Sequence, residues 1–246
     1  MKKMLFFTVL FISVFIASCG VLPKNNNFHP TNSEIELGVV GEKQKSIRKT
    51  NFETFGTPKY DANIKVSVSE VLFTKKSYKQ YLNSLKNKKG IDNMIVMNDS
   101  IQSKPRYTVV KIENRVSVVN SLNKSNFEVF NYLKKSNNPL LVLSLQLIPN
   151  QEFLSLIKNS DAVYLKTDKQ SKQRLFIYKD EKEIGSIDFS KQLIFGYELS
   201  SFCWKVTSRK KIEIATLINE NQNCSNSTKD TPEALEKELI KSSFKF

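Results

Sequence analysis

The chain has 246 residues, of which 40% are hydrophobic and 11% aromatic, and its formal net charge is +14. This apolar content supplies a substantial core and excludes an intrinsically disordered chain. The positive charge comes mainly from lysine rather than from arginine, the side chain suited to bidentate recognition of phosphates and bases, so we expect no nucleic-acid partner. Anionic lipid or glycan is the remaining partner class that the charge could attract.

The N-terminus combines two lysines, an apolar run over residues 4–17 and a cysteine. The run is shorter than the roughly 20 residues of a membrane-spanning helix, so the layout predicts a secretory signal peptide over residues 1–18. Its end, Ile16-Ala17-Ser18-Cys19, resembles the lipobox of bacterial lipoproteins. That resemblance implies cleavage before Cys19, acylation of Cys19 and attachment of the mature chain to a membrane.

The residues after Cys19 bear on where the chain is attached. In enteric lipoproteins, which the signal resembles, an aspartate at the next position retains the protein in the inner membrane, and here that position is Gly20. The resemblance therefore implies the outer membrane with the chain facing the periplasm, and surface exposure stays open. Residues 20–33 are polar and lack apolar periodicity, and they are followed by a short apolar piece over residues 35–40 and a basic patch over residues 43–49. Residues 19–50 are therefore predicted to form a flexible tether that contains His29, the only histidine, although the basic patch could instead contact anionic headgroups.

A globular α+β domain is expected over residues 51–246, and a division is conceivable near residue 149. In its first half, alternating apolar residues predict strands, helical spacing predicts helices, and Ser125 is a candidate helix cap. The expected elements are a strand at 64–73, a helix at 76–88, strands at 94–97 and 107–119, a helix after residue 125 and a strand at 140–148. This order matches that of a ferredoxin-like βαββαβ unit.

The second half is expected to be rich in strands. After a short helix at 151–158, apolar and aromatic runs predict strands at 161–166, 174–178, 183–189, 193–199, 202–206 and 211–217, with a turn at residues 179–182. Asp230 or Thr231 would cap a final helix that begins near Pro232. The chain as a whole thus predicts an α+β fold with a mixed or antiparallel sheet and a few helices.

Lipidation of Cys19 would leave Cys203 and Cys224 as an even pair. In an oxidising compartment such a pair predicts a disulfide, and two separate buried thiols are the alternative. Closing this loop of about 22 residues would stabilise the fold by roughly 3 kcal/mol. The spacing fits no metal motif, so we expect no metal site and no cofactor.

Motifs that carry chemistry are sparse in the globular part. With His29 in the tether, histidine-dependent triads and zinc motifs cannot be assembled, so no catalytic residue is predicted. Two groups remain as candidates. The carboxylates that could serve a hydrolase are Asp161, Asp180, Asp188 and Glu198. The aromatic residues that form either a binding patch or part of the core are Phe195, Tyr197, Phe202 and Trp204.

An anchor, a substantial core and few chemical motifs favour a non-enzymatic role. The leading hypothesis is an accessory or scaffolding subunit of an outer-membrane or periplasmic assembly, with other envelope proteins as partners. A lipoprotein that binds a glycan or lipid ligand is the alternative, and a carboxylate-dependent hydrolase is a weaker one.

Overall fold

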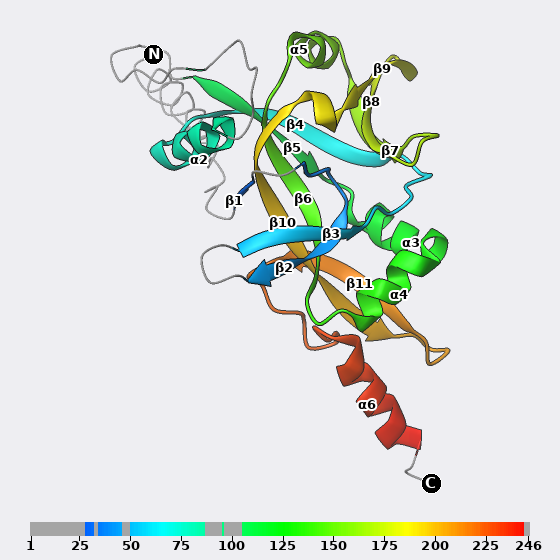
Figure 1. The fold of residues 1–246 in the computed structure, drawn as a ribbon. Coiled ribbons are helices and arrows are strands. Elements are labelled where there is room, and N and C mark those ends of the chain that lie inside the picture. The colour runs from blue at the N-terminus through cyan, green and yellow to red at the C-terminus, as the bar shows by residue number, and fades with distance from the viewer. Residues whose placement is uncertain (1–27, 32–33, 46–49, 87–94, 96–104, 244–246) are drawn as a thin grey trace, which may run out of the picture.

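A computed structural model describes residues 28–31, 34–45, 50–86, 95 and 105–243 (Figure 1). The expected signal peptide, the lipidation site Cys19 and most of the strand expected at 94–97 lie outside these ranges. The described part is an antiparallel open sheet with helices around it, which confirms the predicted α+β class.

Two long antiparallel strands, β6 (Pro139–Ile148) and β10 (Leu193–Val206), form the spine of a branched sheet. On one edge of β6, β5 (Arg106–Ile112) continues the sheet outward, and the hairpin of β2 (Val40–Lys45) and β3 (Thr50–Gly56) joins the same edge further along. On the free edge of β10 lie β1 (His29–Pro30) and β11 (Ile212–Asn219). Beyond β5 follow β4 (Ile64–Leu72), β7 (Ala162–Thr167), β8 (Gln173–Lys179) and β9 (Lys182–Asp188).

Five α-helices and one short 3-10 turn, Phe189–Lys191, accompany the sheet in the described ranges. The helices are α2 (Lys75–Leu85), α3 (Arg115–Ser125), α4 (Phe127–Lys135), α5 (Gln151–Lys158) and α6 (Pro232–Ser243). In this part of the chain, no helix combines the length and apolarity that crossing a membrane requires.

Burial follows from the apolar runs of the spine. All but the last residue of β6 are buried, as its nearly continuous apolar sequence predicts for a strand covered on both faces. The main core extends over most of the sheet. A smaller, mostly aromatic cluster lies beneath α2, and its buried members include Phe28, Phe73, Tyr81, Tyr107 and Phe195.

The first half differs from the ferredoxin-like arrangement. A split βαβ unit needs a parallel strand pair, whereas β4, β5 and β6 pair antiparallel in sequence order. The strand expected at 107–119 ends at Ile112, because Asn114 accepts a hydrogen bond from the backbone N–H of Ser117 and starts α3. The β-branched residues Val118 and Val119 favour a strand locally, but in α3 they are buried against the core.

The expectation of a flexible tether up to residue 50 is wrong for the described residues of that segment. Strand β1 pairs with β10, placing His29 opposite Tyr197, and β2 pairs with both β3 and β6. Phe28 and Leu37 are 7% and 0% exposed. The short alternation of Ile35, Leu37 and Val39 places all three in the main core, while Phe28 joins the aromatic cluster beneath α2.

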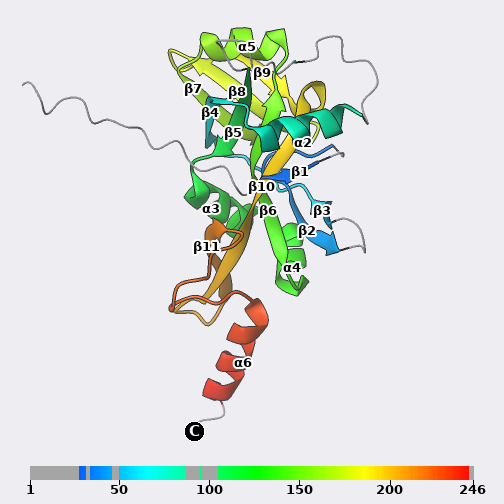
Figure 2. The ribbon, with the colours of Figure 1, turned by 90° about the vertical axis from the view of Figure 1, so that its left-hand side faces the viewer.

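Two further boundaries differ from expectation. The pieces expected at 193–199 and 202–206 are one continuous strand, β10, and α4 begins after Asn126 because Ser125 is the last residue of α3. The final helix begins at Pro232 as predicted, and only part of it packs against the rest of the chain. Leu235 is buried while Ile240 is 56% exposed, and α6 extends away from the body (Figure 2).

Candidate functional site

The predicted aromatic patch belongs to the interior. Phe195, Tyr197, Phe202 and Trp204 are 0%, 3%, 2% and 0% exposed. A register shift between Ile194 and Gly196 separates the first two, so Phe195 packs beneath α2 while Tyr197 joins the main core. The binding-patch interpretation is therefore wrong, because β10 is covered on both faces and leaves these rings no access to solvent.

The four predicted carboxylates do not form one site. Glu198 pairs with Lys111, whose Nζ lies 3.0 Å from Glu198 Oε2, and Asp188 Oδ2 lies 3.4 Å from Arg174 Nη2. Asp161 and Asp180 do come together, because the backbone N–H of Asp180 donates a 2.8 Å hydrogen bond to Asp161 Oδ2. These contacts leave one carboxylate pair to consider.

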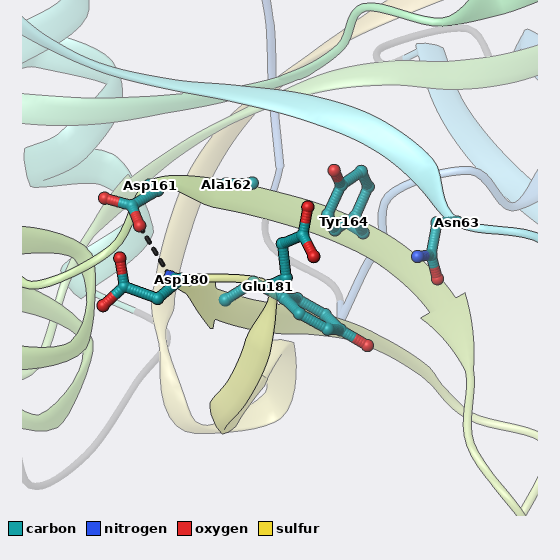
Figure 3. A pocket seen from close by; sticks show the side chains of 7 residues that line it. Asn63, Asp161, Ala162, Tyr164, Asp180 and Glu181 are labelled. Carbon is teal, nitrogen blue, oxygen red and sulfur yellow. Dashed lines mark hydrogen bonds between the residues drawn. The ribbon is translucent and has the colours of Figure 1, made fainter.

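That pair borders an open pocket of about 360 Å³ on the outer side of β7 and β8 (Figure 3). Asp180 and Glu181 form the β8–β9 turn with φ values of 48° and 61°, the left-handed conformation of a two-residue type I′ hairpin. In Figure 3 the Glu181 carboxylate lies on the same side as the Tyr164 ring. Asp161, Asp180 and Glu181 are all exposed, whereas glycoside hydrolysis relies on two carboxyl groups in contrasting environments, one of them apolar.

Sequence reasoning missed a cluster formed by His29, Lys43 and Glu220. His29 Nε2 lies 2.8 Å from Glu220 Oε2 and 3.2 Å from Lys43 Nζ, and Lys43 donates to Glu220 Oε1. The side chains of Lys43 and Glu220 are 15% and 19% exposed. The cluster joins β1, β2 and the residue that follows β11, so it connects the beginning of the described chain to the sheet.

The electrostatics of this cluster are set by partial burial and ion pairing. Burial alone would raise the pKa of Glu220, but hydrogen bonds from His29 and Lys43 and the positive charge of Lys43 together hold it below its ordinary value of 4.5. Burial, followed by the negative charge of Glu220, raises the pKa of the neighbouring Tyr197 to about 12. The side chains of Lys43 and Glu220 are largely buried and are paired with each other, which favours a structural role.

Replacing Glu220 with glutamine should therefore lower stability. The change leaves Lys43 without its carboxylate partner, and we expect the free energy of unfolding at neutral pH to fall by about 2 kcal/mol. The pKa of Glu220 is lower in the folded state than its ordinary value of 4.5. Its contribution to the free energy of unfolding is therefore complete above pH 4.5 and declines as the pH falls through the pKa of the folded state. Urea unfolding should thus show a difference between the two proteins that shrinks below pH 4.5.

Glu181→Gln is the matched control, since Glu181 is an exposed carboxylate in a turn. This variant should stay within about 0.5 kcal/mol of the wild type at every pH. If the free energies of unfolding of the wild type and of Glu220→Gln differed more at acidic pH than at neutral pH, the assigned direction of the pKa shift would be contradicted.

A second concave surface lies between the β2–β3 hairpin and α4. This groove has a volume of about 380 Å³ and is lined by Glu42, Gln44, Glu53, Phe55, Tyr132, Lys135 and Ser136. The rings of Phe55 and Tyr132 are stacked, with centroids 5.9 Å apart and an angle of 28° between their planes. Tyr132 is 64% exposed, because Leu133 is the residue of α4 that enters the core.

Polar side chains surround the stacked rings of the groove. Ser136 Oγ donates to Glu42 Oε1, and Gln44 Nε2 donates to Glu53 Oε2. Lys135 adds a cation at the edge. The groove therefore offers an aromatic platform together with hydrogen-bond donors and acceptors. In the described ranges of the chain as a whole, no group of His, Cys, Asp or Glu is arranged to hold a metal ion.

No protein-family model, curated protein or solved structure matches the chain. Its function is therefore inferred from its own residues.

Proposed function

We propose that the chain is a lipid-anchored envelope protein that binds a glycan in the groove between the β2–β3 hairpin and α4. The observation that carries this proposal is the stacked pair of the half-buried Phe55 and the exposed Tyr132 on a concave surface. Ligand pockets typically combine aromatic walls with a few polar groups, and the smallest of them have volumes of about 300 Å³. A flat aromatic pair gives the apolar C–H face of a sugar ring a surface to pack on.

The polar rim of the groove fits the hydroxyl groups of such a ligand. The carboxylates of Glu42 and Glu53 accept hydrogen bonds, the ammonium of Lys135 donates them, and the amide of Gln44 does both. A lipid tail would desolvate these groups without offering them any hydrogen bond, which costs free energy. Glycan is therefore the favoured ligand class.

The proposed location follows from the signal sequence. Acylation of Cys19 would hold the chain at a membrane, and Gly20 favours the outer membrane with the domain facing the periplasm. Binding at a glycan-rich envelope surface requires no catalytic step. Acyl labelling of the wild type and of Cys19→Ser tests the anchor, and continued labelling of the variant would refute it.

Tyr132→Ala is expected to weaken glycan binding about tenfold, because it removes the exposed half of the stacking platform. Calorimetric titration with soluble peptidoglycan fragments and bacterial oligosaccharides measures the change. Tyr132→Phe keeps the ring and should retain most of the affinity.

Phe127→Ala is the control, because Phe127 lies on the same helix, is 76% exposed and does not line the groove. It should leave binding unchanged. Wild-type protein that binds none of these glycans, or equal affinity of Tyr132→Ala, would overturn the proposal.

An accessory or scaffolding role is the second candidate, and it is favoured by the open edge of β3. Among the strands of the described part, β3 pairs only with β2. Such an edge can accept a strand from a partner protein. Crosslinking in intact cells followed by purification should then recover a stoichiometric envelope partner, and recovery of the chain as a lone species would refute this role.

A further inference from the structure

A row of lysines runs along the solvent face of α2 and its C-cap. Because a helix turns by roughly 100° per residue, Lys75, Lys79 and Lys86 lie within about 40° of one another around the axis. All three are exposed, and they lie opposite the buried residues of the helix, which are Ser77, Tyr81 and Ser84. The row extends over about 16 Å.

This row has little negative charge beside it. The sequence of α2 contains neither Asp nor Glu, and its first turn has no acidic residue. Within the described ranges, no ion pair involves Lys75, Lys79 or Lys86. Among the described residues, the three lysines therefore form a cationic row without an acidic partner.

Helix α2 also contacts the point at which the described chain begins. Gln80 Nε2 donates a 3.2 Å hydrogen bond to the backbone carbonyl of Phe28, and Phe28 packs in the aromatic cluster that includes Tyr81. Only residues 20–27 separate Phe28 from Cys19. Even a fully extended chain of this length spans no more than about 30 Å. An acyl chain on Cys19 would thus hold α2 close to the bilayer.

We propose that the lysine row of α2 docks on the anionic phospholipid headgroups of the membrane that holds the acylated Cys19. The inference rests on the proposed lipid anchor and is independent of glycan binding. Charge complementarity supports it, because lysines are attracted to an anionic bilayer within a Debye length of about 10 Å. A connection of at most about 30 Å keeps the row within reach of that distance.

Docking through α2 would also orient the groove. In both views of the molecule, α2 lies toward the end of the body that carries α5, and α4 lies toward the end that carries α6 (Figures 1 and 2). With α2 on the membrane, the groove beside α4 would be directed away from the bilayer, where a periplasmic glycan could reach it.

Amine labelling of the acylated chain tests the proposal. The protein is reconstituted in vesicles of phosphatidylcholine alone or with phosphatidylglycerol, and the labelling rate of each lysine is followed by peptide mass spectrometry. In anionic vesicles, Lys75, Lys79 and Lys86 should react about fivefold more slowly than in neutral vesicles, and added salt should remove this protection. Three exposed lysines near the β10–β11 turn should react equally in both: Lys205 at the end of β10, and Lys210 and Lys211 in the turn.

Two glutamine variants sharpen this test. In Lys75→Gln/Lys79→Gln/Lys86→Gln, the remaining lysine of the helix, Lys76, should lose its lipid-dependent protection. In Lys205→Gln/Lys210→Gln/Lys211→Gln, which removes the same charge, Lys76 should keep it. Equal labelling of α2 in the two kinds of vesicle would overturn the proposal, and so would protection in neutral vesicles, which would point to another occupant.

Flotation separates this proposal from the anchor on which it rests. A chain that floats with neutral vesicles but shows no protection by phosphatidylglycerol keeps the anchor and refutes the docking face. A chain that fails to float with neutral vesicles, yet is protected on α2 by anionic ones, refutes the anchor and keeps the lysine face.

Discussion

Trp204→Ala is expected to lower the free energy of unfolding by about 3–5 kcal/mol, because it removes a large side chain from a closely packed interior. Trp204 is 0% exposed, and its ring lies 5.8 Å from that of Phe130 and 6.3 Å from that of Phe202. Urea unfolding followed by far-UV circular dichroism measures the loss without relying on tryptophan emission. If Trp204 were an exposed binding residue, its replacement by alanine would change the free energy of unfolding by less than about 0.5 kcal/mol.

Trp204→Phe is the informative comparison. The buried Nε1 of Trp204 has no hydrogen-bond partner among the described residues, so phenylalanine removes an unpaired donor together with part of the ring volume. We expect the free energy of unfolding to fall by about 1 kcal/mol, well below the decrease for the alanine variant. Similar losses for the two variants would show that the ring volume is not what stabilises this part of the core.

Removal of the Cys203–Cys224 disulfide should lower the free energy of unfolding by about 3 kcal/mol. The two residues are bonded, their Cα atoms are 5.6 Å apart, and they are separated by 21 positions in the sequence. The bond constrains the unfolded chain and fastens the loop after β11 to β10. The same loop is held by backbone hydrogen bonds between Trp204 and Lys229.

The measurement compares unfolding of the wild type with and without a reductant. Cys203→Ala/Cys224→Ala should unfold like the reduced wild type and should not respond to reductant. Non-reducing peptide mass spectrometry that finds free thiols at both positions would contradict the bond, as would a double variant as stable as the oxidised protein.

Several elements were predictable because their determinants are local. An apolar run with no polar face can only be buried on both sides, as in β6. The helix predicted at 151–158 has a nearby polar cap, since Asn150 accepts a hydrogen bond from the backbone N–H of Phe153. The hairpin turn at residues 179–182 was predictable from the polar residues between two apolar runs. The disulfide was predictable because two cysteines, an even number, remain once Cys19 is set aside.

The groove could not be predicted in the same way. Its aromatic pair joins Phe55 and Tyr132, which lie on different elements and meet only because β2 pairs with β6 and brings the hairpin beside α4. In the sequence, Tyr132 is one of several aromatic residues at helical spacing, and nothing local distinguishes it from Phe130, whose ring packs against Trp204. Exposure, the property that makes Tyr132 a candidate binding residue, arises from the packing of α4.

The sequence by itself determined the α+β class, most strands and the cysteine pair, because each depends on neighbouring residues or on composition. The signal peptide over residues 1–18 stays a prediction. Tertiary structure decided which aromatic rings are buried, that residues 115–125 are a helix, and that His29 belongs to the sheet. The contacts of Glu220 with His29 and Lys43 span 191 and 177 positions. Such pairs become visible only when the chain has folded, because no local pattern encodes which distant strand a segment will join.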